Sequence, residues 1–247
     1  MLGYRMFAHA LRMVFTNLPD ALRLSVALVV AGQLALWLLV YRHEPALTPA
    51  GPEDIGPGAS VGMQALAGFL VNGLLGAWVA VAWHRFVLLQ EYPQAVLPPW
   101  SASRTLSYFG RLLLVSLIVG LAGGLGAAVL ILPLTAALGS VGVGVGGAVV
   151  GTGVIWLSLR LGLVMPSAAI DQPMGLRQSW AATAPVSRDL VGLSVIGLAG
   201  LAATALLAMP GPIGALLGAV ASWITLMVGA SVLTTIYGVA VEGRELR

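Results

Sequence analysis

The sequence predicts an all-α membrane protein, a polytopic bundle of six transmembrane helices with amphipathic interfacial helices on the cytoplasmic side. The first observation is composition: of 247 residues, 59% are hydrophobic and only 9% are charged, and the mean hydropathy is +0.97. A soluble domain carries about a quarter charged residues because its surface faces water. The second observation is six apolar stretches, each near the roughly 20 residues that cross about 30 Å of hydrocarbon as a helix. We expect residues 1–247 to form a single integral membrane domain.

The amino-terminal segment, residues 1–20, is predicted to form an amphipathic helix on the cytoplasmic side. One helical face carries Phe7, Leu11, Val14, Phe15 and Leu18, and the opposite face carries Arg5, His9, Arg12 and Thr16. This pattern is typical of a helix that lies in the membrane interface with its arginines toward anionic headgroups. Residues 174–184 and 98–110 are expected to form similar segments, so that each odd-numbered span follows one.

The six spans are predicted at about 22–41, 61–83, 112–134, 141–163, 190–209 and 213–237. Only a short turn at Gly139–Ser140 separates the third span from the fourth, so this boundary is the least defined. Pro133 predicts a kink in the third span. A local pattern also recurs, with Asp-x-x-x-Leu-Ser-Val at residues 20–26 and again at 189–195. This recurrence indicates a repeat of an interfacial helix followed by a two-span hairpin.

The distribution of arginine predicts that both termini lie in the cytoplasm. If the spans alternate from a cytoplasmic amino terminus, the external segments are 42–60, 139–140 and 210–212. They contain Arg42 but none of the other eleven arginines, which lie at the termini, in internal loops or near cytoplasmic span ends. This asymmetry follows the positive-inside rule.

Glycine spacing in the spans predicts close packing between helices. Gly142, Gly144 and Gly147 satisfy the G-x-G-x-x-G pattern of a dinucleotide-binding turn. That turn needs a preceding strand and an acidic residue about 20 positions on, and neither is present. Small residues four apart instead allow two helix backbones to approach closely in lipid. Helix contacts are therefore expected at Gly120 and Gly124, Gly142 and Gly146, Gly147 and Gly151, and Gly214 and Gly218.

No catalytic site, metal or cofactor is expected. Residues 58–62 match the G-x-S-x-G of a nucleophile elbow, but Ser60 lies in a Pro/Gly-rich loop rather than a strand-to-helix turn. The chain has no cysteine, which excludes disulfides and thiolate chemistry. Its arginines are spread singly and lysine is absent, so a nucleic-acid partner is not expected.

Two segments resemble a known group of proteins. They are AVAWHRFVLLQEYP (Ala80–Pro93) and RLGLVMPSAAIDQPMGLRQSWAAT (Arg160–Thr183). With their Arg–apolar–Pro stretch and the amphipathic residues 176–180, they resemble bacterial six-span proteins of the superfamily that contains YciC-like proteins and the membrane domain of some glycerophosphodiester phosphodiesterases. The resemblance implies a helical domain of the bacterial inner (plasma) membrane, whose biochemical role is largely undefined. No phosphodiesterase domain is implied, because the chain has no soluble segment long enough for a barrel.

Polar residues within the spans are the candidates for a transport site. Gln33 and Asn72 form either interhelical hydrogen bonds, worth roughly 1 kcal/mol each, or a polar lining for a solute. No Asp, Glu or Lys lies centrally in a predicted span, which disfavours a proton- or cation-coupled carrier. Arg160 is expected either to reach the headgroups or to pair with Asp171.

Basic residues on the cytoplasmic side are candidates for contacts with lipid headgroups or a partner protein. They are Arg5, Arg12, His84, Arg85, Arg160 and Arg177. Each basic residue near an anionic leaflet contributes roughly 1 kcal/mol of attraction. The same residues could instead only fix the topology, and His84 with Arg85 could form a solvated pair beside Trp83.

The leading functional hypothesis is a non-catalytic inner-membrane protein that organises or regulates membrane lipids or another membrane or cytoplasmic protein. The alternative is a carrier or channel for a small neutral or anionic solute, which would use Gln33, Asn72 and Arg160. A third is a membrane enzyme acting on lipid, with His84 as its acid or base. A cavity lined by Gln33 and Asn72 would favour the carrier, whereas a dry centre packed by glycine would favour the organising protein.

Overall fold

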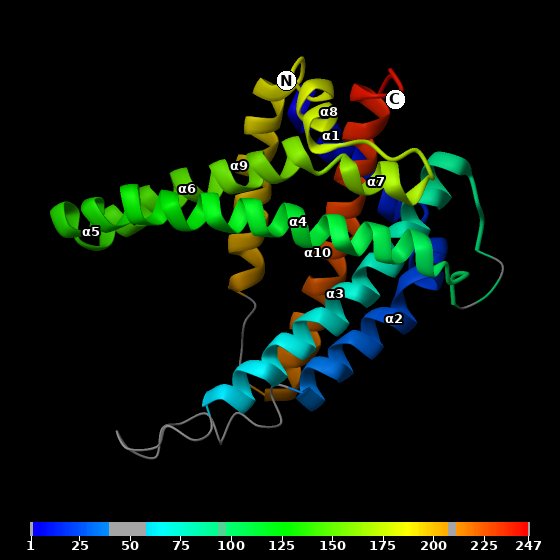
Figure 1. The fold of residues 1–247 in the computed structure, drawn as a ribbon, viewed down its shortest axis with the longest axis horizontal. Helices are drawn as coiled ribbons and strands as arrows, with labels where there is room; N and C mark the ends of the chain where they lie inside the picture. Colours follow the sequence, from blue (N-terminus) through cyan, green and yellow to red (C-terminus); the bar gives the residue numbers. More distant parts are fainter. Residues whose placement is uncertain (1, 40–57, 94, 96, 207–210, 247) are drawn as a thin grey trace.

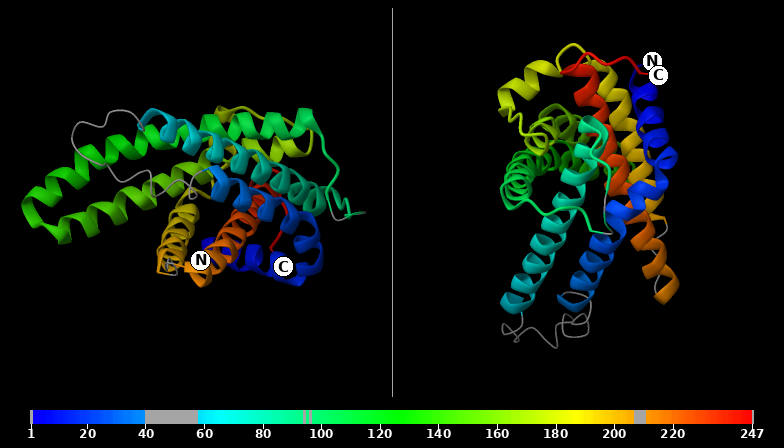
Figure 2. Two further views of the ribbon diagram at one scale, coloured as in Figure 1. Left: turned by 90° about the horizontal axis from the view of Figure 1, so that it is seen from below. Right: turned by 90° about the vertical axis from the view of Figure 1, so that its right-hand side faces the viewer.

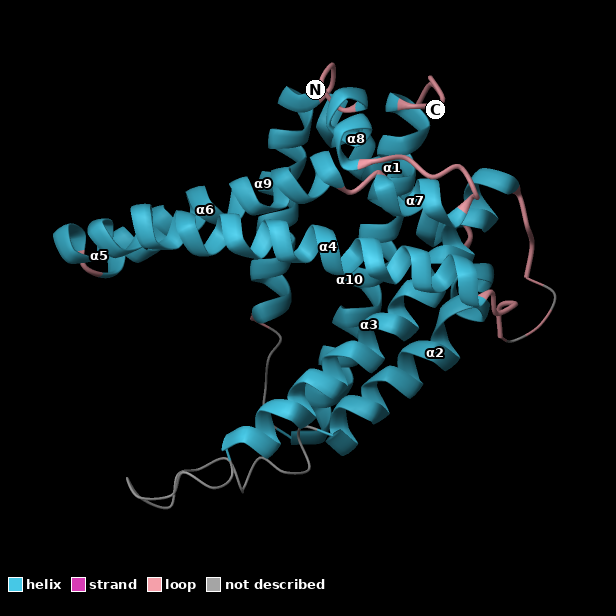
Figure 3. Ribbon diagram, viewed as in Figure 1, coloured by secondary structure: helices cyan, strands magenta, loops and turns pink. Residues whose placement is uncertain are grey.

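The computed structural model describes residues 2–39, 58–93, 95, 97–206 and 211–246, and all regular elements in these ranges are helical (Figures 1 and 3). The long helices are α2 (Leu18–Leu39), α3 (Gly58–Leu89), α4 (Ala102–Gly126), α6 (Ser140–Leu161), α9 (Ser187–Ala205) and α10 (Gly211–Ala240). Six helical segments are long and apolar enough to cross a membrane, and each corresponds to one predicted span. The predicted all-α membrane fold is confirmed.

The second span extends further than predicted. Helix α3 continues to Leu89, past His84 and Arg85, because a change in polarity does not end backbone hydrogen bonding. The helix ends at Gln90, whose φ of 57° is left-handed. The amide of Glu91 then donates to the carbonyl of Arg85 at 3.4 Å, as in a Schellman motif. This ending turns Glu91 back toward Arg85.

The third span is interrupted close to the predicted kink. A π-helical segment, η2 (Ala127–Ile131), joins α4 to α5 (Leu132–Leu138), and Pro133 lies in the first turn of α5. Proline lacks an amide donor and its ring crowds the carbonyl four residues earlier, here Val129 within the widened turn. Gly139, with a φ of 59°, then turns the chain into α6.

Two groups of helices run in different directions. Helices α2, α3, α9 and α10 run broadly along one direction, and both termini lie at the same end of this group (Figures 1 and 2). Helices α4 and α6 form a long hairpin that runs crosswise to them and carries α5 at its tip (Figure 2). The turn at Gly139 thus lies to one side, whereas alternating parallel spans would place it at the end opposite the termini.

The predicted amino-terminal amphipathic segment forms a separate helix, α1 (Leu2–Thr16), which packs against α9 and α10. Its buried residues are Gly3, Met6, Ala10 and Val14. This buried face differs from the apolar face predicted to lie in the membrane interface, since only Val14 belongs to both sets. Small residues lie on the buried face because α1 approaches α9 closely: a Cβ atom at Gly3 would overlap the carbonyl of Asp189. The Asp189 carboxylate also accepts hydrogen bonds from the amides of Leu2 (3.0 Å) and Gly3 (3.3 Å).

The other two predicted amphipathic segments have different outcomes. Residues 176–182 form a short helix, α8 (Leu176–Ala182). The segment 98–110 does not form a separate element, because α4 begins at Ala102 and continues through Gly110 without a break. No glycine, proline or capping signal interrupts the backbone between Ala102 and Tyr108, so the helix propagates into the span.

The local pattern at residues 20–26 and 189–195 has equivalent surroundings at its two sites. Ser25 donates to the carbonyl of Ala21 at 2.6 Å, and Ser194 donates to the carbonyl of Leu190 at 2.7 Å. All four of these residues are buried at the starts of α2 and α9. Each of these spans follows a short helix, α1 or α8.

The glycines predicted to pack have mixed positions. A Cβ atom would meet neighbouring groups at Gly142 (Leu134), Gly146 (Ile131) and Gly151 (Leu198). At Gly120, Gly124, Gly147 and Gly218 it would meet no atom of the described chain within 4 Å. For these four, the predicted helix contact is wrong within the described chain, because their helix faces point away from the other helices. Gly214 is buried in α10.

Candidate functional site

A buried short helix, α7 (Val164–Ala169), organises the end of the bundle near the termini. It follows α6 and packs against α3, α4 and α10. A helix this short leaves several carbonyls without intrahelical partners. Arg111 donates to the carbonyl of Val164 and Arg85 to that of Ala169, both at 2.9 Å. These two arginines thereby hold α7 in place between α6 and α8.

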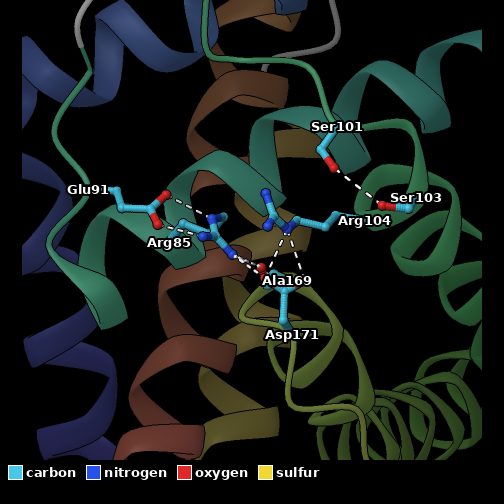
Figure 4. A network of polar contacts seen from close by, with 7 residues as sticks. All are labelled: Arg85, Glu91, Ser101, Ser103, Arg104, Ala169 and Asp171. Atoms are coloured by element: carbon cyan, nitrogen blue, oxygen red, sulfur yellow. Dashed lines mark hydrogen bonds and ion pairs between the residues drawn. The ribbon is translucent and has the colours of Figure 1, made fainter.

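An ion-pair network surrounds the end of α7 (Figure 4). The Arg85 guanidinium donates to both carboxylate oxygens of Glu91, from Nε at 2.8 Å and from Nη2. Its Nη1 donates to Asp171 at 3.0 Å, and Arg104 Nε lies 2.9 and 3.0 Å from the two oxygens of Asp171. Asp171 therefore links α3 and α4 to the segment after α7. The network joins 80–93 to 160–183, the two segments on which the family resemblance rests.

The charge of Asp171 makes this network dependent on pH. The hydrogen bonds from Arg104, with the positive charges of Arg104 and Arg85, hold the pKa of Asp171 below its ordinary value, against the opposing effect of partial burial. A depressed folded-state pKa means that the stabilisation is complete above the unfolded pKa, about 3.9, and is lost as the pH falls through the folded value.

We expect Asp171→Asn to lower the melting temperature at neutral pH, and the difference from the parent protein to shrink as the pH is lowered. Asparagine tolerates the left-handed backbone at this position, where φ is 60°, so the substitution tests charge rather than strain. Thermal unfolding in detergent over a pH series measures the difference. A difference that stays constant down to acid pH would contradict an ionic origin.

The sequence allowed an ion pair between Arg160 and Asp171, but Arg160 has other partners in the structure. Its side chain is buried, with the guanidinium carbon 3.9 Å from the Trp180 ring centroid and 5.4 Å from that of Trp156. Nη2 donates to the Trp180 carbonyl at 2.8 Å, and the Arg160 carbonyl accepts from Ser179 at 2.8 Å. Arg160 therefore attaches α8 to the end of α6 and is covered by indole rings rather than directed at headgroups.

The six basic candidates fall into two groups. Arg5, Arg12 and Arg177 are exposed on α1 and α8, although Arg5 also donates to the carbonyl of Leu246 at 3.1 Å. His84, Arg85 and Arg160 make contacts within the protein. For this second group, the predicted headgroup or partner contact is replaced by internal contacts, because α3 and α6 continue into the packed region around α7.

Gln33 and Asn72, the two polar candidates in the spans, line one cavity between α2, α3, α4 and α10. The cavity has a volume of about 250 Å³, and Tyr108 and Ser222 also line it. Gly32 permits this arrangement, because a Cβ atom there would overlap the Asn72 side-chain oxygen. In the part of the chain that the structure describes, no hydrogen bond joins Gln33 to Asn72.

A second polar cluster lies beside this cavity. His84 is fully buried, with Nδ1 2.7 Å from Thr234 Oγ1 and Nε2 3.2 Å from Tyr108 Oη. Its neighbour Trp83 donates to Ser231 at 2.8 Å. Tyr108 and Thr234 were not identifiable as site residues from the sequence, because they lie on different helices and neither belongs to a local motif.

The described residues contain no group of three His, Asp or Glu side chains that could hold a metal ion. No family model, curated protein or solved structure matches the chain. The resemblance to the YciC-like superfamily therefore stays a prediction.

Proposed function

We propose that the protein is a multi-pass carrier for a small neutral polar solute, in the bacterial inner membrane with both termini in the cytoplasm. The observation that carries the proposal is the cavity that Gln33 and Asn72 line together. Two amides supply donors and acceptors without charge, as do Tyr108 and Ser222. Among the described residues, no arginine or acidic residue lines this cavity, which favours a neutral solute over an anion.

The size of the cavity limits the solute. A volume of about 250 Å³ accommodates several water molecules, each with a share of about 30 Å³ of liquid volume, or one small polyol or amide. Amide side chains are costly in hydrocarbon, where each polar group needs a partner. A bound solute or water would supply that partner. The cavity is thus suited to a polar solute of a few heavy atoms.

The test is solute permeability of liposomes that contain the purified protein, with glycerol and urea as probes in stopped-flow light scattering. We expect at least one probe to enter faster than into protein-free liposomes. Gln33→Leu and Asn72→Leu should each bring the rate down to that background, because both remove the polar lining at nearly constant volume. Thr204→Val, a polar-to-apolar change on α9 away from the cavity, is the matched control. Wild-type rates in both leucine variants would overturn the proposal.

A second candidate function is the organisation of anionic lipids or a protein partner. The observation that favours it is the exposure of Arg5, Arg12 and Arg177 on α1 and α8, at the end of the bundle where both termini lie (Figure 1). Glycerol and urea rates equal to background, with anionic lipid that co-purifies with the parent protein but not with an Arg12→Gln, Arg177→Gln variant, would support this function over the carrier. Unchanged lipid in that variant would exclude it.

A further inference from the structure

The buried cluster around His84 lies between two cavities. Tyr108, at one end of the cluster, lines the solute cavity with Gln33 and Asn72. Thr234, at the other end, lines a cavity of about 240 Å³ near the termini, which we call the terminal cavity. His84 contacts both side chains through its two ring nitrogens. Three side chains from α3, α4 and α10 thus form a continuous polar connection.

The hydrogen bonds define which group donates and which accepts at each step of this connection. The Thr234 hydroxyl donates to the carbonyl of Ala230 at 2.8 Å, so its oxygen accepts from His84 Nδ1–H. A neutral imidazole protonated at Nδ1 accepts at Nε2, and the Tyr108 hydroxyl supplies that proton. Each member of the chain therefore donates to the next, from Tyr108 to His84 to Thr234.

The terminal cavity has polar groups that can hold water or accept a proton. His9, Arg244 and Glu245 line it, together with Thr234 and Thr235. The Thr235 hydroxyl is buried and has no hydrogen-bond partner in the described chain. A buried hydroxyl is normally paired with protein or ordered water, and this one faces a cavity large enough for water.

We propose that Tyr108, His84 and Thr234 form a proton relay between the solute cavity and the terminal cavity. In one passage, the Tyr108 oxygen takes a proton from the solute cavity as its own proton moves to His84 Nε2. The Nδ1 proton of His84 then moves to Thr234, and the Thr234 hydroxyl proton, released from Ala230, enters the terminal cavity. One proton is transferred and no residue changes its net charge. Rotation of the two hydroxyls and water-mediated exchange of the imidazole proton, which returns His84 to the Nδ1–H tautomer, restore the starting state.

The relay gives the proposed carrier an energy source, and this part of the inference depends on the proposed function. A proton that moves only when a solute donates to or accepts from Tyr108 would couple solute movement to a proton gradient. The other ionisable groups beside the relay are Arg85, next to His84 on α3, and the residues of the terminal cavity. Arg85 is held by Glu91 and Asp171, so its charge does not change over the physiological range.

The test measures proton and glycerol entry in the same liposomes, with the full-length protein and a trapped pH indicator. Under an imposed pH gradient, we expect proton entry above that of protein-free liposomes, and an increase when glycerol is present. Tyr108→Phe and Thr234→Val preserve side-chain shape but remove one hydroxyl each from the relay. Each should reduce proton entry to background. Glycerol should still enter in Thr234→Val, because Thr234 does not line the solute cavity, whereas Tyr108→Phe also removes a hydroxyl from that cavity. Ser194→Ala, which removes a buried hydroxyl on α9, is the matched control and should keep both activities.

The outcomes separate the relay from the carrier. Proton entry at the wild-type rate in Tyr108→Phe and Thr234→Val would overturn the relay, as would background proton entry in the parent protein. Glycerol entry in the absence of proton entry would leave the carrier intact and overturn the relay alone. Proton entry that depends on both hydroxyls, without entry of any solute probe, would support the relay and overturn the carrier. Thermal unfolding of each variant checks that its fold is retained.

Discussion

Replacing Gly142 with alanine will destabilise the protein, whereas the same substitution at Gly147, in the same helix, will not. A Cβ atom at position 142 would overlap the backbone carbonyl of Leu134, and no rotamer change can remove a backbone clash. Position 147 is open, with no atom of the described chain within 4 Å of a Cβ atom. We expect Gly142→Ala to cost about 1–3 kcal/mol, as overpacking does. Gly147→Ala should be neutral or stabilising by up to about 1 kcal/mol, because alanine is the better helix former.

Thermal unfolding in one detergent compares the two variants directly. Because both substitutions add one methyl group to α6, their effects on helix propensity cancel in the comparison, and the difference reports the contact with Leu134. Equal melting temperatures would show that α5 does not pack against α6 as the structure has it. The glycine spacing that resembles a dinucleotide-binding turn would then lack its structural explanation.

Replacing Arg160 with lysine will destabilise the attachment of α8, although the charge is kept. The Arg160 guanidinium is planar and lies against the indole of Trp180 while it donates to the Trp180 carbonyl. A lysine ammonium is a compact point charge and does not reproduce the planar stacking. A desolvated cation–π contact is worth about 2 kcal/mol, and we expect a loss of that order. Arg177→Lys, an exposed site on α8 itself, should change stability by no more than about 0.5 kcal/mol.

Limited trypsin digestion gives a local measure of the same effect. Cleavage after residue 177 requires α8 to open, so it should proceed faster in Arg160→Lys than in the parent protein. Arg177→Lys keeps a trypsin site and should be cleaved at the parental rate. Parental stability and cleavage in Arg160→Lys would mean that Arg160 does not hold α8. The headgroup contact expected from the sequence would then be the better explanation of this residue.

Composition and apolar run length were sufficient to predict the six long helices, because the requirement for apolar length in a membrane acts on each helix separately. The direction of α4 and α6 relative to the other helices has no such local signal. Pro133 and Gly139 predicted where the third span bends and ends, because proline and glycine act on the backbone at their own positions. The face of α1 that packs against α9 and α10 was not predictable from its apolar residues, since the buried Gly3 and Ala10 are small rather than strongly apolar.

The candidate site was predicted only in part, because local sequence signals identify some of its residues and not others. Gln33 and Asn72 were identifiable because an amide in an apolar span stands out in the sequence, and the structure brings them to one cavity. Tyr108 and Thr234 were not identifiable, because tyrosine at an interface and threonine in a helix are ordinary. Arg85 and Arg160 were identified from the sequence as candidate basic residues. Their partners in the structure, Asp171 and Trp180, were not, because these contacts depend on where α7 interrupts the helical chain. Residues that function through long-range contacts leave no pattern in the sequence around them.

The contact between α1 and Asp189 has a consequence for the order in which the protein assembles. Helix α1 is synthesised well before α9 and α10, yet it packs against those two helices, and the amides of Leu2 and Gly3 bind the Asp189 carboxylate at the start of α9. Contacts between such distant segments form late, because the intervening chain must first be arranged. We therefore expect α1 to lack these contacts until the last two spans are made, and its arginines and exposed aromatic residues would suit it to a lipid surface in the interval. On this expectation, the amphipathic character of α1 would serve the nascent chain before its last two spans are made.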